Sequence, residues 1–180
     1  MPTTFHLFPL LPPEVRLTPN PPQLQVNSEA RREALRCYGA YFQTEEMPHA
    51  CIYLAPERDT VHIHEALLAY LGDVERAALR RMVIEVHDHL LFTSYWMDSL
   101  KGMQRLSEIV LVVKPFAPPV AATSWPPVMG DEEIVNGLRE SFVEGVRGCL
   151  EWSVPLVRIV SEDGKGMGSF QVKWEGEETV

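Results

Sequence analysis

Two short β-branched segments flank a longer apolar segment in the middle of the chain, and this arrangement constrains the fold most. The flanking segments are MVIEVH (82–87) and EIVLVVK (108–114), and LLFTSYWMDSLKGM (90–103) stands between them. Short runs rich in Val and Ile are typical of strands, and the middle segment has the length of a helix. Because such a helix returns the chain to the starting edge of a sheet, the sequence predicts a parallel, right-handed βαβ unit.

The residues before this unit predict a helix and a hairpin. Asn27 or Ser28 can cap a helix over 28–42, whose apolar residues recur every three or four positions. Two β-rich segments, 50–54 and 60–64, flank the polar linker APERD. Such a pair of segments is typical of a hairpin.

The remaining pattern completes the expected fold. Two short helices are predicted at 65–71 and 73–81, a long amphipathic helix at 131–152, and a closing hairpin from strands at 155–160 and 169–174. The sequence therefore predicts an α+β fold, in which a mixed sheet contains one βαβ unit and two hairpins and helices pack on the sheet.

The acidic composition limits the classes of partner. The formal charge at pH 7 is -9 and the isoelectric point is about 5.1, whereas a phosphate-binding surface needs clustered Lys and Arg, so we expect no nucleic-acid partner. The three cysteines form no CxxC pair, which indicates free thiols in a reducing compartment. No run approaches the ~20 apolar residues of a membrane span, and the N-terminus lacks the basic start of a signal peptide. We therefore expect a cytoplasmic or nuclear protein with no membrane partner.

The N-terminal part contains two motifs of the form Glu-x-Arg. They stand in FPLLPPEVRL as Glu14-Val15-Arg16 and in QVNSEARREAL as Glu29-Ala30-Arg31, and IYLAPERDTVHI follows before the predicted βαβ unit. In this order, residues 5–115 resemble the two-EXR domain family, which is widespread in filamentous fungi. The resemblance implies an architecture and attaches no reaction to it.

The chain departs from the family pattern after the first motif. In the family, LPPE-x-R-L opens a full helix, whereas here Leu17 runs into Thr18-Pro19 and then Pro21-Pro22. Prolines remove amide donors and push the preceding residue out of the helical region. We therefore expect that a segment of the family fold is missing here, through splicing or through degeneration. A chain that has lost a helix in this way would expose apolar surface and be prone to aggregate.

The residues of each Glu-x-Arg motif need partners elsewhere, because helical residues two apart do not face each other. We expect Glu14 to pair with Arg31, and Arg16 with Glu29, through charge-assisted hydrogen bonds. Such a latch would join the N-terminal segment to the helix at 28–42 and specify the arrangement more than stabilise it. The alternative is that the arginines bind a ligand, because their forks suit carboxylates of any origin.

Two features favour an interaction role. LPPE resembles the start of an F-box, the helical motif that docks proteins onto ubiquitin-ligase scaffolds, although only LPPEVRL of that motif is present. Trp125 lies in a proline-rich loop (116–130), beyond which residues 131–174 supply a helix and hairpin that we expect to pack on the same domain. This Trp either folds onto the core or is offered to a protein partner.

Histidines on two predicted strands form the best candidate metal site. His62 and His64 alternate and so point to one face, and Glu85 and His87 do the same on another strand, with Asp88-His89 directly after. If these strands are neighbours, His62, His64 and His87 can hold zinc. Because the spacing contains no HExxH helix and no Cys pair, ordinary core or surface histidines are the alternative.

No catalytic signature accompanies these motifs. DGKGMGS lacks the GxxxxGK[ST] spacing of a phosphate loop, and no GxSxG elbow is present. We therefore expect a non-catalytic protein-interaction module of the two-EXR type with a protein partner. One alternative is an F-box-like ubiquitin-ligase adaptor, and the other is a small metal-binding protein or metal-dependent enzyme that uses zinc at His62, His64 and His87.

Overall fold

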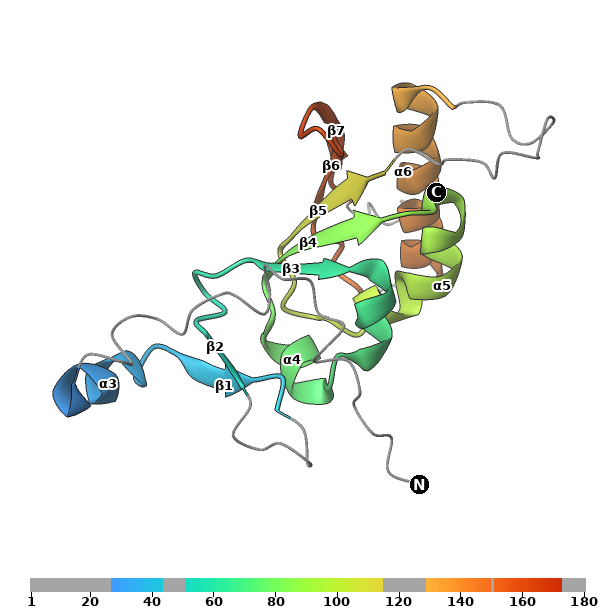
Figure 1. Cartoon of the computed structure of the whole chain (residues 1–180). Coiled ribbons are helices and arrows are strands. Elements are labelled where there is room, and N and C mark those ends of the chain that lie inside the picture. The colour runs from blue at the N-terminus through green and yellow to red at the C-terminus, as the bar shows by residue number, and fades with distance from the viewer. Residues whose placement is uncertain (1–26, 44–50, 115–128, 150, 173–180) are drawn as a thin grey trace.

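A five-stranded mixed sheet lies at the centre of the molecule, and a two-stranded sheet lies beside it (Figure 1). The computed structural model describes residues 27–43, 51–114, 129–149 and 151–172. The strands are β1 (Gly39–Tyr41), β2 (Ile52–Leu54), β3 (Val61–His64), β4 (Arg81–Val86), β5 (Glu108–Val113), β6 (Leu156–Ser161) and β7 (Gly166–Phe170). The helices are α3 (Ser28–Ala34), the 3-10 helix η2 (Glu65–Tyr70), α4 (Asp73–Ala78), α5 (His89–Lys101) and α6 (Asp131–Gly148). The predicted α+β fold with a mixed sheet is confirmed.

The predicted βαβ unit is formed by β4, α5 and β5. Both strands alternate half-exposed and buried residues, and they pair in parallel from Arg81 opposite Glu108 to Val86 opposite Val113. The helix begins directly after β4, because Asp88 Oδ1 accepts hydrogen bonds from the N–H groups of the first turn. Phe92 of α5 is buried in the core over the sheet, where such a side chain stabilises the fold by about 1.5–3 kcal/mol.

The large sheet has the order β3-β4-β5-β6-β7, with four parallel strands and an antiparallel edge strand. Parallel neighbours need crossover connections, which here contain η2 and α4, then α5, then α6. The predicted apolar stripe of α6 is buried at Leu138, Phe142 and Val146. None of the helices among the described residues has the length and apolar character needed to cross a membrane.

The closing hairpin is confirmed, but its second strand begins earlier than expected. β7 begins at Gly166, inside the glycine-rich stretch that reads as the turn in the sequence. A Cβ atom at Gly168 would lie 3.1 Å from Cγ1 of Val135. Glycine in this strand therefore lets α6 approach the sheet closely, whereas Gly164, with φ of 81°, makes the turn.

The predicted helix over 28–42 was wrong beyond its first two turns. α3 ends at Ala34, and Gly39–Tyr41 forms β1, which pairs antiparallel with β2. Gly39 weakens the helix, and Tyr41 fits a strand well. The chain turns again at Phe42, which has a φ of 58° and donates its N–H to Oε1 of Glu75 at 2.7 Å.

The predicted hairpin between 50–54 and 60–64 was also wrong, although both strands exist. β2 pairs with β1, and β3 pairs in parallel with β4. A turn does form between them, where the Ala55 N–H donates to Oδ2 of Asp59 at 2.7 Å. The two strands nevertheless belong to different sheets. Pairing with β4 buries the apolar residues of β3 in the core.

Candidate functional site

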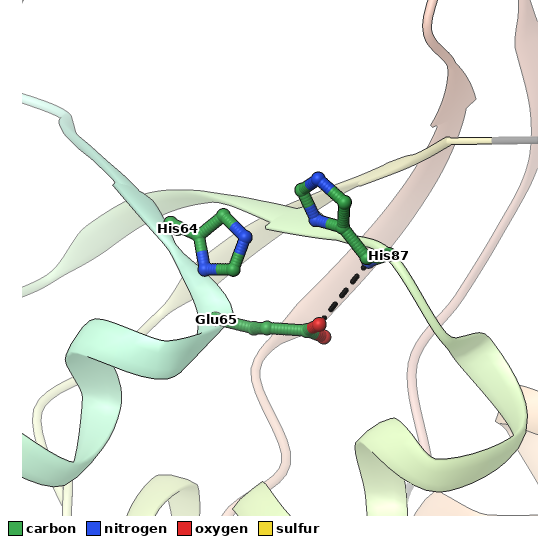
Figure 2. A group of neighbouring side chains, drawn as sticks. All are labelled: His64, Glu65 and His87. Carbon is green, nitrogen blue, oxygen red and sulfur yellow. Dashed lines mark hydrogen bonds between the residues drawn. The ribbon is translucent and has the colours of Figure 1, made fainter.

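The carboxyl ends of β3 and β4 bring two imidazoles and a carboxylate together. His64 ends β3, Glu65 begins η2, and His87 directly follows β4. One possible ligand atom from each lies within 4.8 Å of the others, and the two imidazole centroids are 4.4 Å apart (Figure 2). Among the described residues, this is the one group of His, Cys, Asp or Glu with the spacing of metal ligands. We call His64, Glu65 and His87 the sheet-edge cluster.

The Glu65 carboxylate is only partly satisfied. Its Oε1 accepts a hydrogen bond from the backbone N–H of His87 at 3.2 Å, whereas its Oε2 is buried and has no hydrogen-bond partner. Burial raises the pKa of Glu65, and the hydrogen bond from the His87 N–H opposes this rise. The carboxylate therefore offers one free oxygen beside the two imidazoles (Figure 2).

The surroundings of His64 favour its neutral imidazole. Burial lowers the pKa of His64, and the electrostatic effect of the nearby His87 lowers it further. Nδ1 of His64 accepts a hydrogen bond from the N–H of Ala66 at 3.1 Å, which caps the start of η2. The neutral ring therefore carries its proton on Nε2.

The predicted ligand His62 is engaged elsewhere. Its Nε2 lies 3.0 Å from Oε1 of Glu85, and Oε2 of Glu85 lies 2.8 Å from Nζ of Lys114. The hydrogen bond from Lys114 lowers the pKa of Glu85, and the same bond raises the pKa of Lys114. The structure thus brings together His64 and His87 of the predicted zinc set, whereas His62 pairs with Glu85 instead.

Glu65 is the cluster residue that sequence reasoning missed. It lies in the segment predicted as a short helix, so the alternation of β3 does not point to it. The signal is its position, because ligands in open sheets with parallel strands lie beyond the carboxyl ends of the strands.

His89, the first residue of α5, does not join the cluster, and its two ring nitrogens are buried without a hydrogen-bond partner. Burial lowers the pKa of His89.

The predicted latch and the loop tryptophan lie mostly outside the described residues. Glu14, Arg16 and Trp125 all fall in undescribed segments, so the latch stays a prediction. Its other half, Glu29 and Arg31, lies on α3. The positive charge of Arg31 acts on the phenol of Tyr53 in β2, where it opposes a rise in the Tyr53 pKa that comes chiefly from Cys51.

The helix α5 carries apolar residues on its outward side as well as in the core. Phe92, Met97 and Leu100 are buried. Leu90, Leu91 and Tyr95 are 50%, 47% and 67% exposed, and we call these three residues the outer face of α5. Apolar residues on two sides make α5 unusual for a helix that covers a sheet, since its solvent side is normally polar.

Comparisons with known proteins identified no relative of this chain. No family model, curated protein or solved structure matches the chain. The two-EXR resemblance therefore depends on the sequence motifs within residues 5–115 alone, and it stays a prediction.

Proposed function

We propose that the chain is a two-EXR protein that acts, in the cytoplasm or nucleus, as a non-catalytic protein-interaction module. The family assignment depends on the two Glu-x-Arg motifs and on the PERDT segment that follows them. The interaction role depends on one observation, the outer face of α5. The acidic overall charge also favours a protein partner over nucleic acid.

The outer face of α5 has the chemistry of a binding surface. Leu91 and Tyr95 are four residues apart on the helix, so their side chains are neighbours on its surface. A tyrosine combines a large apolar ring with a polar hydroxyl group, and tyrosines are enriched among the residues that dominate binding energy. Leu90 is a further exposed apolar residue in the first turn of the helix. A partner that covers these side chains removes apolar area from water, which is the main favourable term in protein association.

The contacts of His62 and His64 give no support for a nucleophilic mechanism. Within the described residues, the hydrogen bonds and ion pairs of His62 and His64 go to Glu85 and to the backbone N–H of Ala66. A nucleophilic mechanism needs an imidazole that accepts the proton of a Ser or Cys. Neither of these two contacts joins an imidazole to a Ser or Cys.

The test is co-purification of the tagged chain from cell extract, with bound proteins identified by mass spectrometry. We expect a protein that binds the wild-type chain and is lost from the double variant Leu91→Glu, Tyr95→Glu. When that protein is purified and titrated against each chain, the double variant should bind at least about 30-fold more weakly, the equivalent of roughly 2 kcal/mol.

The control is Val74→Glu, which replaces an exposed apolar residue on α4, 64% exposed, by the same acidic residue and adds one negative charge where the double variant adds two. This control should bind as the wild type does, and circular dichroism should show equal folding of all three chains. Recovery of ubiquitin-ligase scaffold subunits would favour the F-box-like alternative. Partners that bind the double variant as tightly as the wild type would show that the outer face of α5 is not the interaction surface.

A further inference from the structure

We propose that the sheet-edge cluster of His64, Glu65 and His87 is a binding site for one divalent transition metal ion of the zinc class. This inference is independent of the interaction role, because it uses none of the residues of the outer face of α5. It also revises the metal set expected from the sequence, since Glu65 takes the place of His62.

The backbone presents all three side chains at one edge of the sheet. β3 and β4 pair in parallel with His64 opposite Glu85, so the residues that end or follow these strands lie side by side. Zinc ligands lie ~2.0–2.2 Å from the metal, and at tetrahedral angles they are therefore roughly 3.4 Å from one another. The ligand atoms of the cluster lie within 4.8 Å of one another, so their separations exceed the tetrahedral spacing by at most roughly 1.4 Å.

The unpartnered oxygen of Glu65 is a second, independent indication of a cation. Oε2 is buried and receives no hydrogen bond, whereas Oε1 is held by the His87 N–H at 3.2 Å. Buried polar atoms normally have a partner, and an orphan therefore needs an explanation. A metal ion between the carboxylate and the imidazoles supplies the missing partner, and the hydrogen bond to Oε1 fixes the direction of the carboxylate as metal sites require.

The two imidazoles lie close enough together to bind one ion, because their ring centroids are 4.4 Å apart. If Nδ1 of His64 binds the metal, it gives up its hydrogen bond from the Ala66 N–H. If Nε2 binds the metal, the ring proton moves to Nδ1, and the same hydrogen bond is lost. Ala66 is exposed, so water can satisfy its N–H after this change.

The donor set selects the class of metal. Two imidazole nitrogens and one carboxylate oxygen suit zinc and similar first-row ions, whereas calcium and magnesium prefer oxygen ligands throughout. Three protein ligands leave a fourth position for water or for a donor from a partner. The charges beside the site do not oppose the ion strongly, because the nearby Lys114 is already paired with Glu85.

The experiment is a zinc titration of the purified, metal-free 180-residue chain by isothermal calorimetry, followed by a cobalt titration read by visible absorption. We expect one zinc ion per chain and a cobalt spectrum of nitrogen and oxygen ligands without a thiolate band. His87→Ala should weaken zinc binding by more than the roughly 10- to 100-fold that loss of an outer-shell partner costs. Glu65→Gln should also weaken it, although Gln keeps the acceptor for the His87 N–H.

The matched control is His62→Ala. It removes an imidazole of β3 that pairs with Glu85 and is not part of the cluster. It should bind zinc within about twofold of the wild type, a difference of only ~0.4 kcal/mol. Because His62 and His87 are exposed, the thermal melts of both variants should match that of the wild type. Absence of zinc binding, an equal loss in His62→Ala, or a thiolate band from Cys37, Cys51 or Cys149 would overturn the proposal. Zinc binding should persist in the Leu91→Glu, Tyr95→Glu variant, so failure of this inference is distinguishable from failure of the interaction role.

Discussion

The close packing of α6 depends on the absence of a side chain at Gly145. A Cβ atom at this position would lie 3.1 Å from Sδ of Met97 on α5 and 3.1 Å from Cζ3 of Trp152. Gly137 lies on the same helix, and nothing lies within 4 Å of a Cβ atom built there. The substitutions Gly145→Ala and Gly137→Ala therefore make the same chemical change with and without a close contact.

The expected difference between the two variants follows from two opposing terms. Ala in place of Gly in a helix interior raises the free energy of unfolding by roughly 0.5–1 kcal/mol, and Gly137→Ala should show this gain. At Gly145 the same gain is offset by overpacking, which costs about 1–3 kcal/mol. Trp152 has little room to move, because it is buried and stacks on Phe142 with ring centroids 5.9 Å apart. Gly145→Ala should therefore be less stable than Gly137→Ala by about 1–3 kcal/mol.

The assay is urea unfolding followed by far-ultraviolet circular dichroism, with both variants and the wild type at one protein concentration. The free energies of unfolding should fall in the order Gly137→Ala, wild type, Gly145→Ala, with equal slopes against urea. If Gly145→Ala gains as much stability as Gly137→Ala, then α6 does not approach Met97 and Trp152 this closely, and the reasoning is refuted.

Two further predictions concern charged side chains of the folded core. Lys114→Met should lower the free energy of unfolding at pH 7 by about 0.5–1 kcal/mol, because it removes one of the two partners of a partly buried Glu85 and leaves only His62. The pKa of Glu85 is lowered from 4.5, so this contribution to stability is present above pH 4.5 and is lost as the pH falls through the folded-state pKa. Urea titrations at several pH values should therefore show the stabilities of variant and wild type converging in acid. A difference that stays constant with pH would contradict the assignment. Glu75→Ala should cost about 1–2 kcal/mol, because it leaves the Phe42 N–H without its acceptor at 2.7 Å. Hydrogen exchange should then accelerate at Phe42 more than in β4, and uniform acceleration would argue against a local role for this bond.

Local periodicity was sufficient to predict the central part of the fold. The strands β4 and β5 alternate apolar residues along one face, and α5 between them has the length and the Asp88 cap of a helix. These signals come from residues close together in the sequence, so no distant contact is needed to read them. The same holds for α6, whose apolar stripe is continuous from Ile134 to Val146.

Local signals failed where two elements compete for the same residues. Gly39–Tyr41 carries apolar residues that fit the end of a helix as well as a short strand, and pairing with β2 decides in favour of the strand. The segment 60–64 can pair with either neighbour in the sequence. It pairs with β4, because Val61 and Ile63 are then buried in the main core.

The sequence by itself determined the types of most elements, the parallel unit at the centre and the presence of histidines on two strands. Only the tertiary structure decided which histidines meet and which carboxylate joins them. The physical reason is that the register of two parallel strands places His64 and His87 at one edge, whereas Glu85 and Lys114 draw His62 away. Such distances depend on the pairing of residues far apart in the chain, and no local pattern in the sequence encodes them.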